Sequence, residues 1–171
     1  MFLSNQIKNQ IKSKIKPNQK SNQIKPMKVH EFFSPHYTLE ELTRSRRFPF
    51  VANIPTEEVV GNLQALCDNV LEPLRRVWKA PIYVNSAYRC RRLNKLVGGV
   101  RSSQHCLGQA ADITTGDCYY NTRLGNLIRR LDLPFDQLIF ENWDPELKVC
   151  DWIHVSYGPR HRHQVIHKKK G

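Results

Sequence analysis

The chain has 171 residues, 40% of them hydrophobic, which is enough for one domain with a core of its own. Its formal net charge is +12, which favours anionic partners such as nucleic acid, acidic lipid or cell-wall polymers. No apolar run approaches the length of a membrane-spanning helix, and five cysteines without C-x-x-C spacing argue against a disulfide framework or a Cys₄ zinc site.

Residues 1–28 form a segment of low complexity, built mostly from Asn, Gln, Lys, Ser and Ile. The segment holds seven lysines and no acidic residue, so it carries more than half of the net charge. Its few apolar side chains cannot offset the entropy lost on ordering, and we predict a disordered basic tail. Met27 is an alternative start of the protein. The first residues lack the apolar core of a secretory signal, so we expect synthesis in the cytoplasm.

Two helices are expected before the first strand. Thr38, with Glu41 three residues later, forms a capping box and predicts a short helix. Thr56 opens the longest helix, whose apolar residues recur at spacings of three and four as far as Trp78. Pro73 lies within this helix and should kink it or end its regular part.

Short β-rich or alternating segments predict four strands, at residues 81–86, 110–114, 135–140 and 152–157. Two further helices are expected between them, at residues 91–96 and 121–131. Helices and strands with long connections predict an α+β domain, in which a small antiparallel sheet packs with helices. We place this domain at residues 29–158. The basic, His-rich residues 159–171 are expected to form a flexible C-terminal tail.

Two separate stretches contain the residues with the strongest chemical signal. The first reads SQHCLGQAAD and contains His105 and Asp112, and the second reads WIHVS and contains His154. Two imidazoles and one carboxylate are donors that a catalytic Zn²⁺ accepts while one position stays open to water. The sequence therefore predicts a metal site built from these three residues.

The residues around these donors suit a rigid site. Gly108 lets the loop between the first two donors turn back on itself, and Ala110 lets the backbone pack closely. In a regular strand His154 lies on the face opposite Ile153, which would point into the core. Cys106 is interpreted as a small apolar filler rather than a fourth ligand.

The pattern S-x-H-x-x-G-x-A-x-D, completed by the distant W-I-H, resembles the M15 family of zinc D-Ala-D-Ala peptidases, in particular its phage-type members. The resemblance covers roughly residues 33–157 and fills every position of the pattern. It implies the Hedgehog/DD-peptidase fold and Zn²⁺ held by His105, Asp112 and His154. It also implies hydrolysis of peptidoglycan stem peptides, by a D-Ala-D-Ala carboxypeptidase or an endolysin-like endopeptidase.

The resemblance further implies two catalytic side chains. Asp151 lies three residues before His154, where the family has an acidic general base that carries a proton from water to the leaving amine. This odd offset puts the two on opposite faces of a strand, so we predict a turn or bulge at Cys150–Asp151. The family often has Glu at this position, and Glu141 is the second candidate. Arg89, at the end of the sequence NSAYR, corresponds to an arginine that polarises the scissile carbonyl or holds a substrate carboxylate.

Three functions are weighed. The first is the zinc peptidase, and the second is a non-catalytic, metal-containing wall-binding module on the same fold, which the Asp at position 151 keeps open. The third is nucleic-acid binding through patches such as Arg44–Arg47, but no motif that reads nucleic acid is present, and we expect no specific binding. We expect a monomer without membrane insertion that reaches the cell wall after release, for example as a phage-encoded protein.

Overall fold

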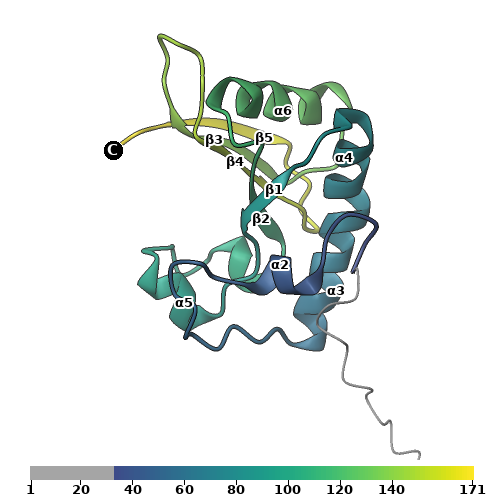
Figure 1. Cartoon of the computed structure of the whole chain (residues 1–171), viewed down its shortest axis with the longest axis vertical. Helices are drawn as coiled ribbons and strands as arrows, with labels where there is room; N and C mark the ends of the chain where they lie inside the picture. The colour runs from purple at the N-terminus through teal and green to yellow at the C-terminus, as the bar shows by residue number, and fades with distance from the viewer. Residues whose placement is uncertain (1–32) are drawn as a thin grey trace, which may run out of the picture.

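The structure, a computed structural model, describes residues 33–171 (Figure 1). The basic tail predicted for residues 1–28 lies outside this range. The first described helix, α2 (Leu39–Thr43), begins where the capping box predicts, because the Thr38 hydroxyl accepts a hydrogen bond of 3.1 Å from the backbone N–H of Glu41.

The long helix predicted from Thr56 to Trp78 is present, and its regular α-helical part is interrupted before Pro73, which is one of the two outcomes predicted there. It consists of α3 (Glu57–Leu66), a π-helical segment η1 (Cys67–Leu71) and α4 (Glu72–Trp78). In a continuous α-helix the ring of Pro73 would clash with the carbonyl four residues earlier, and a wider turn just before the proline avoids this contact. The helix ends at Lys79, which has the left-handed conformation.

In residues 33–171 the strands form one sheet of five, in the order β1-β2-β4-β3-β5. All neighbouring pairs are antiparallel except β3 and β5, which run parallel. The predicted α+β class with a small, mainly antiparallel sheet is therefore confirmed. The strands are β1 (Tyr83–Ser86), β2 (Ala110–Thr114), β3 (Gln137–Trp143), β4 (Trp152–Ser156) and β5 (Gln164–Lys169).

Strand β5 corrects the expectation that residues 159–171 form a flexible tail. Its residues pair with β3 along the edge of the sheet, and the ring of His167 stacks on Phe140 with 4.6 Å between centroids. Just before the strand, Arg162 binds the buried carboxylate of Asp136. Because residues 159–171 are mostly basic and polar, their sequence indicates neither the strand nor the residues that it contacts.

The remaining helices are α5 (Arg91–Leu96), the short 3₁₀ helix η2 (Gln104–Leu107) and α6 (Cys118–Arg130). Helix α6 starts three residues earlier than predicted because Asp117 caps it, accepting a 2.9 Å hydrogen bond from the backbone N–H of Tyr120. Gly125 brings α6 close to the sheet: a Cβ there would lie 2.6 Å from Phe140 and 2.8 Å from Ile153.

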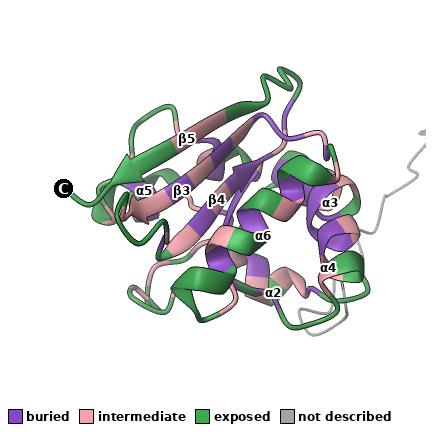
Figure 2. Cartoon of the chain, turned by 90° about the horizontal axis from the view of Figure 1, so that it is seen from above, coloured by how far each residue is buried: buried purple, intermediate pink, exposed green. Residues whose placement is uncertain are grey.

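The two faces of the sheet therefore differ. One face packs against α6 and buries the side chains of Leu138, Phe140, Ile153 and Val155 completely. Figure 2 shows this buried layer on β4 and α6, with β5 largely exposed at the edge. The opposite face, with Ile139 and His154, lines an open cleft. Within residues 33–171, no helix combines the length and apolar character that crossing a bilayer requires.

Candidate metal centre

Three donor side chains converge at one point of the cleft: His105, Asp112 and His154. The Nε2 atom of His105 lies 3.1 Å from Nδ1 of His154 and 3.3 Å from Oδ1 of Asp112, and that oxygen lies 3.0 Å from Nδ1 of His154. His105 and Asp112 are buried, and His154 is partly exposed. In the described part of the chain this is the one group of three or more His, Cys, Asp or Glu residues close enough to hold a metal ion, and Cys106 is not part of it.

The sheet register brings two of the donors together. Asp112 on β2 and His154 on β4 are direct cross-strand partners, so their side chains project side by side from the same face. On β4 the neighbouring Ile153 and Val155 are fully buried, as the alternation in the sequence predicts. Both donors thus stand on rigid strands in the middle of the sheet.

The third donor comes from the turn before β2. His105 lies in η2, which ends at Gly108 in the left-handed conformation with φ of 70°. A Cβ at position 108 would lie 2.7 Å from the carbonyl oxygen of Val59, so only glycine fits both the angle and the contact. This close turn is the one that the sequence predicts at Gly108.

Hydrogen bonds around the donors orient them. Nδ1 of His105 lies 2.7 Å from the carbonyl oxygen of Ala87. Because a carbonyl oxygen only accepts hydrogen bonds, Nδ1 carries the proton, and the unprotonated Nε2 is the atom that can bind a metal ion. The guanidinium of Arg89 donates to Oδ2 of Asp112 and, through Nε, to Ser86 Oγ at 2.7 Å. Oδ1 of Asp112 therefore remains on the side of the two imidazoles.

The electrostatics of the cluster favour a neutral imidazole beside an ionised carboxylate. Burial lowers the pKa of His105 from its usual value, although Asp112 opposes this effect. Burial alone would raise the pKa of Asp112, but the adjacent His105 and His154 outweigh burial and hold that pKa well below its usual range. Deprotonated donors are the forms that bind a metal ion.

The cluster opens into a cleft of about 780 Å³. Its lining comes from the sheet and from the segments that follow α2 and α5, two helices that lie on the same side of β2 in Figure 1. The described part of the chain lines it with residues from three regions: the segment after α2, the loops and strands around the cluster, and the C-terminal segment. This volume lies within the usual range of ligand-binding clefts, roughly 300–1,000 Å³.

The two predicted catalytic residues are placed differently. Arg89 lines the cleft, but its guanidinium already binds Asp112, so it orients a donor rather than pointing only at substrate. Asp151 lies at a bend directly before β4, as predicted, but its side chain is exposed, accepts a 2.9 Å hydrogen bond from Asn142 and is not among the residues that line the cleft. Glu141 does line the cleft, in an ion pair of 3.1 Å with Lys168.

One part of the site was missed by sequence reasoning. The fully buried Asp136 accepts hydrogen bonds from Gln104 Nε2 at 2.9 Å and from Arg162 Nε at 2.7 Å. Gln104 directly precedes the metal donor His105 in η2, so the carboxylate of Asp136 connects this segment, the metal loop, to the C-terminal segment by hydrogen bonds. The sequence gives no sign of this link because its members are far apart in the chain and each is a common surface residue type.

A comparison with known protein families shows to which family the chain belongs. A family model described as Peptidase M15 matches residues 35–144, which is more than half of the chain. The chain belongs to the peptidase M15 family. No curated protein gives a significant match to this M15 chain. The matched range includes His105 and Asp112, and the structure adds His154 from the strand that follows it.

Membership of this family implies a metallopeptidase, and the residues present fit a metal. Two imidazole nitrogens and one carboxylate oxygen all lie within 4.8 Å of one another, and one imidazole has its tautomer fixed by a backbone carbonyl. Three protein ligands of this type are typical of catalytic zinc sites, which keep a further position for water.

Proposed function

We propose that this M15 protein is a zinc-dependent peptidase that hydrolyses peptidoglycan stem peptides, as a D-Ala-D-Ala carboxypeptidase or as an endopeptidase. The observation that supports this most is the convergence of His105, Asp112 and His154 at the buried end of a cleft large enough for a peptide. The family match supports peptide substrates in general, and the stem-peptide assignment is the finer step of the proposal.

The three donors are assigned to Zn²⁺, which when bound supplies Lewis-acid chemistry and lowers the pKa of water to about 7. The protein's own residues provide orientation. The backbone carbonyl of Ala87 fixes the tautomer of His105, and Arg89 fixes the carboxylate of Asp112. Such outer hydrogen bonds keep the donor atoms aimed at one point before any ligand arrives.

Proton transfer is assigned to Asp151. It follows Cys150 at the bend before β4 and lies three residues before His154, the donor on that strand. In this role its carboxylate takes a proton from the attacking water and gives it to the leaving amine. A side-chain rotation away from Asn142 is required, since the carboxylate is hydrogen-bonded there. Glu141 is the alternative base, because it lines the cleft, although Lys168 already binds it.

The test uses the full chain, first stripped of metal and then loaded with one equivalent of Zn²⁺. The substrate is the pentapeptide L-Ala-D-isoGlu-L-Lys-D-Ala-D-Ala, and mass spectrometry identifies the products. We expect hydrolysis by the zinc-loaded protein, none after chelation, and none from a His154→Ala variant. Loss of terminal D-Ala identifies the carboxypeptidase, and any other cleavage identifies an endopeptidase. A protein that binds Zn²⁺ stoichiometrically but leaves the pentapeptide and intact muropeptides uncut would overturn the proposal.

A second candidate is a metal-containing wall-binding module without turnover. One observation favours it: the carboxylate of Asp151 faces Asn142 rather than the cleft. This candidate predicts that zinc-loaded protein binds stem peptides tightly and releases them unchanged. The product analysis above separates it from the peptidase.

A further inference from the structure

The cleft that holds the metal cluster is strongly cationic. Its lining includes seven arginine or lysine side chains and only two carboxylates, which belong to Asp112 and Glu141. Six of these cations occupy two walls, one formed by the segment after α2 and one by the C-terminal segment that ends in β5, and the seventh, Arg89, pairs with Asp112 of the metal cluster. The seven are Arg44, Arg46, Arg47, Arg89, Arg160, Arg162 and Lys168.

On the C-terminal wall each cation contacts a protein carboxylate, and two of them share the carboxylate of Asp136. Arg162 binds Asp136 through Nε and a terminal nitrogen, at 2.7 and 2.8 Å, and Arg160 approaches the same carboxylate at 3.4 Å. Lys168 pairs with Glu141 at 3.1 Å. At the centre, Arg89 pairs with Asp112. Each of these four cations therefore has a carboxylate partner within the protein.

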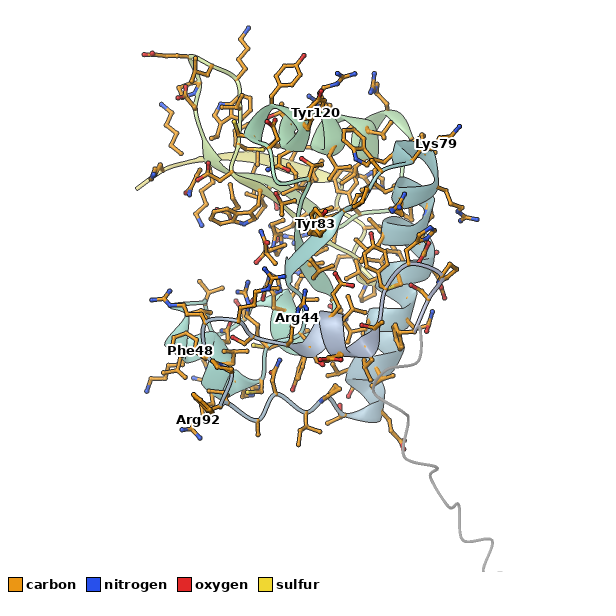
Figure 3. All side chains as sticks on the ribbon, viewed as in Figure 1. Arg44, Phe48, Lys79, Tyr83, Arg92 and Tyr120 are labelled. Carbon is orange, nitrogen blue, oxygen red and sulfur yellow. The ribbon has the colours of Figure 1, made fainter. Side chains whose placement is uncertain are left out.

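The wall after α2 differs. Arg44 and Arg46 are exposed and line the cleft, and neither forms an ion pair with any carboxylate in residues 33–171. Arg47 lies with its guanidinium 5.3 Å from the ring centroid of Phe48. In Figure 3, Arg44 lies beside α2 in the middle of the molecule, whereas Arg92 on α5 lies at its lower end. Two guanidinium groups without a carboxylate partner in residues 33–171 therefore line the same cleft as the candidate metal centre.

This wall is held in place by hydrogen bonds. The side-chain amide of Asn53 donates to the carbonyl oxygens of Thr43 at 2.6 Å and Tyr88 at 2.8 Å. It thereby links the residue before Arg44 to the residue before Arg89. Within the segment, the backbone N–H of Phe48 donates to Ser45 Oγ at 3.1 Å. The backbone that presents Arg44 is thus fixed relative to the metal cluster.

We propose that Arg44 and Arg46 bind a carboxylate of the substrate, so that the enzyme selects peptides with a free carboxylate near the bond that is cut. The inference rests on the proposed function. The guanidinium groups of Arg44 and Arg46 have no carboxylate partner within residues 33–171, whereas each cation of the C-terminal wall has one. Guanidinium binds carboxylate in a two-pronged geometry, so a substrate carboxylate is a suitable ligand for them. Stem peptides offer two such groups: the α-carboxylate of D-isoglutamate and the C-terminal carboxylate.

The experiment measures binding without cleavage. Four versions of the pentapeptide are labelled with a dye at the N-terminus. In the first both carboxylates are free, in the second and third one of the two is amidated, and in the fourth both are amidated. Fluorescence anisotropy gives their Kd values for the metal-stripped full chain. We expect a peptide in which the recognised carboxylate is free to bind about 10- to 100-fold more tightly than one in which it is amidated, which is the usual contribution of hydrogen bonds to charged groups. The singly amidated peptides show which of the two carboxylates is recognised.

Matched variants connect the preference to the two arginines. We expect the double variant Arg44→Gln/Arg46→Gln to lose the preference and to bind all four peptides with similar, weak affinity. The control Arg91→Gln/Arg92→Gln removes the same charge from exposed residues of α5 outside the cleft and should keep the preference. Thermal unfolding checks that both variants are folded.

Several outcomes overturn the inference. Equal affinity of the wild type for all four peptides would do so, as would an unchanged preference in the Arg44/Arg46 variant. Tighter, Arg44/Arg46-dependent binding of a labelled single-stranded oligonucleotide than of any peptide would assign the wall to nucleic acid instead. Cleavage by the zinc-loaded protein is measured separately. A binding preference without cleavage would therefore refute the peptidase function while supporting carboxylate recognition.

Discussion

The guanidinium of Arg89 donates to Oδ2 of Asp112, which leaves Oδ1 of that carboxylate beside the two imidazoles. Arg89 thus acts on the metal donor directly, in addition to any contact with substrate. We predict that Arg89→Lys weakens Zn²⁺ affinity about 10- to 100-fold, the usual effect of losing a partner that orients a ligand. Lysine keeps the charge but lacks the planar fork in which two separate nitrogens of Arg89 bind Ser86 and Asp112.

Competition with a chromogenic chelator measures this affinity, and kcat is measured separately at saturating Zn²⁺. If Arg89 acts only on substrate, the Lys variant will have wild-type zinc affinity and a reduced kcat. That result would contradict the orienting role. Arg92→Lys, on an exposed residue outside the cleft, is the control.

Asp151 and Glu141 can be separated as general bases. We predict that Asp151→Asn lowers kcat by about 10²–10⁴, the usual contribution of general acid–base catalysis, without changing zinc affinity. Glu141→Gln breaks the ion pair with Lys168 but should change kcat less than about tenfold. Steady-state kinetics on the pentapeptide measure both. The reverse order of effects would transfer the role to Glu141.

Much of the fold follows from local signals in the sequence. The caps at Thr38 and Thr56, the alternation around Ile153 and the glycine turn at Gly108 all depend on residues close in the chain. For the same reason His105 and Asp112 could be recognised from their spacing in one short stretch, and His154 from the W-I-H of β4. Each of these features follows from a local sequence preference, and the tertiary structure of this protein agrees with that preference.

Other features depend on contacts that sequence spacing does not encode. The register that sets Asp112 opposite His154 is fixed by the packing of the whole sheet. Strand β5 reads as a charged tail because its stability comes from an edge pairing with β3 and from the burial of Asp136. The direction of the Asp151 side chain depends on a single hydrogen bond to Asn142, which no pattern reports.

Gly125 tests the packing of α6 on the sheet. A Cβ at this position would lie 2.6 Å from the ring of Phe140, so Gly125→Ala forces the helix or the ring to move. We predict a loss of about 1–3 kcal/mol in the free energy of unfolding, as is usual for overpacked cores. Urea unfolding followed by circular dichroism measures it.

Gly61 is the matched control for this substitution. It lies within α3, and a Cβ there has nothing within 4 Å. Gly61→Ala should therefore stabilise the protein by about 0.5–1 kcal/mol, because alanine favours a helix over glycine. Equal effects of the two substitutions would show that helix propensity, and not contact with Phe140, governs position 125.

The buried carboxylate of Asp136 joins the C-terminal segment to the metal loop. It accepts hydrogen bonds from Arg162 and from Gln104, the residue before His105. We predict that Asp136→Asn lowers the free energy of unfolding at pH 7 by about 1–2 kcal/mol, the lower part of the range for hydrogen bonds to charged groups, since solvent screens the partly exposed arginines. Glu146→Gln, on an exposed residue, should have no effect.

The pH dependence of this difference tests its cause. The hydrogen bonds from Arg162 outweigh burial and hold the pKa of Asp136 below its usual value in the folded protein. A carboxyl group with a lowered folded pKa stabilises the protein above its unfolded pKa, about 3.9, and this contribution is lost as the pH falls toward the folded pKa. The gap between wild type and Asp136→Asn should therefore be largest near pH 7 and shrink below about pH 4. Urea unfolding at pH 7, 5 and 3 measures the gap. A gap that stays constant down to pH 3 would mean that the side chain contributes through its shape rather than its charge.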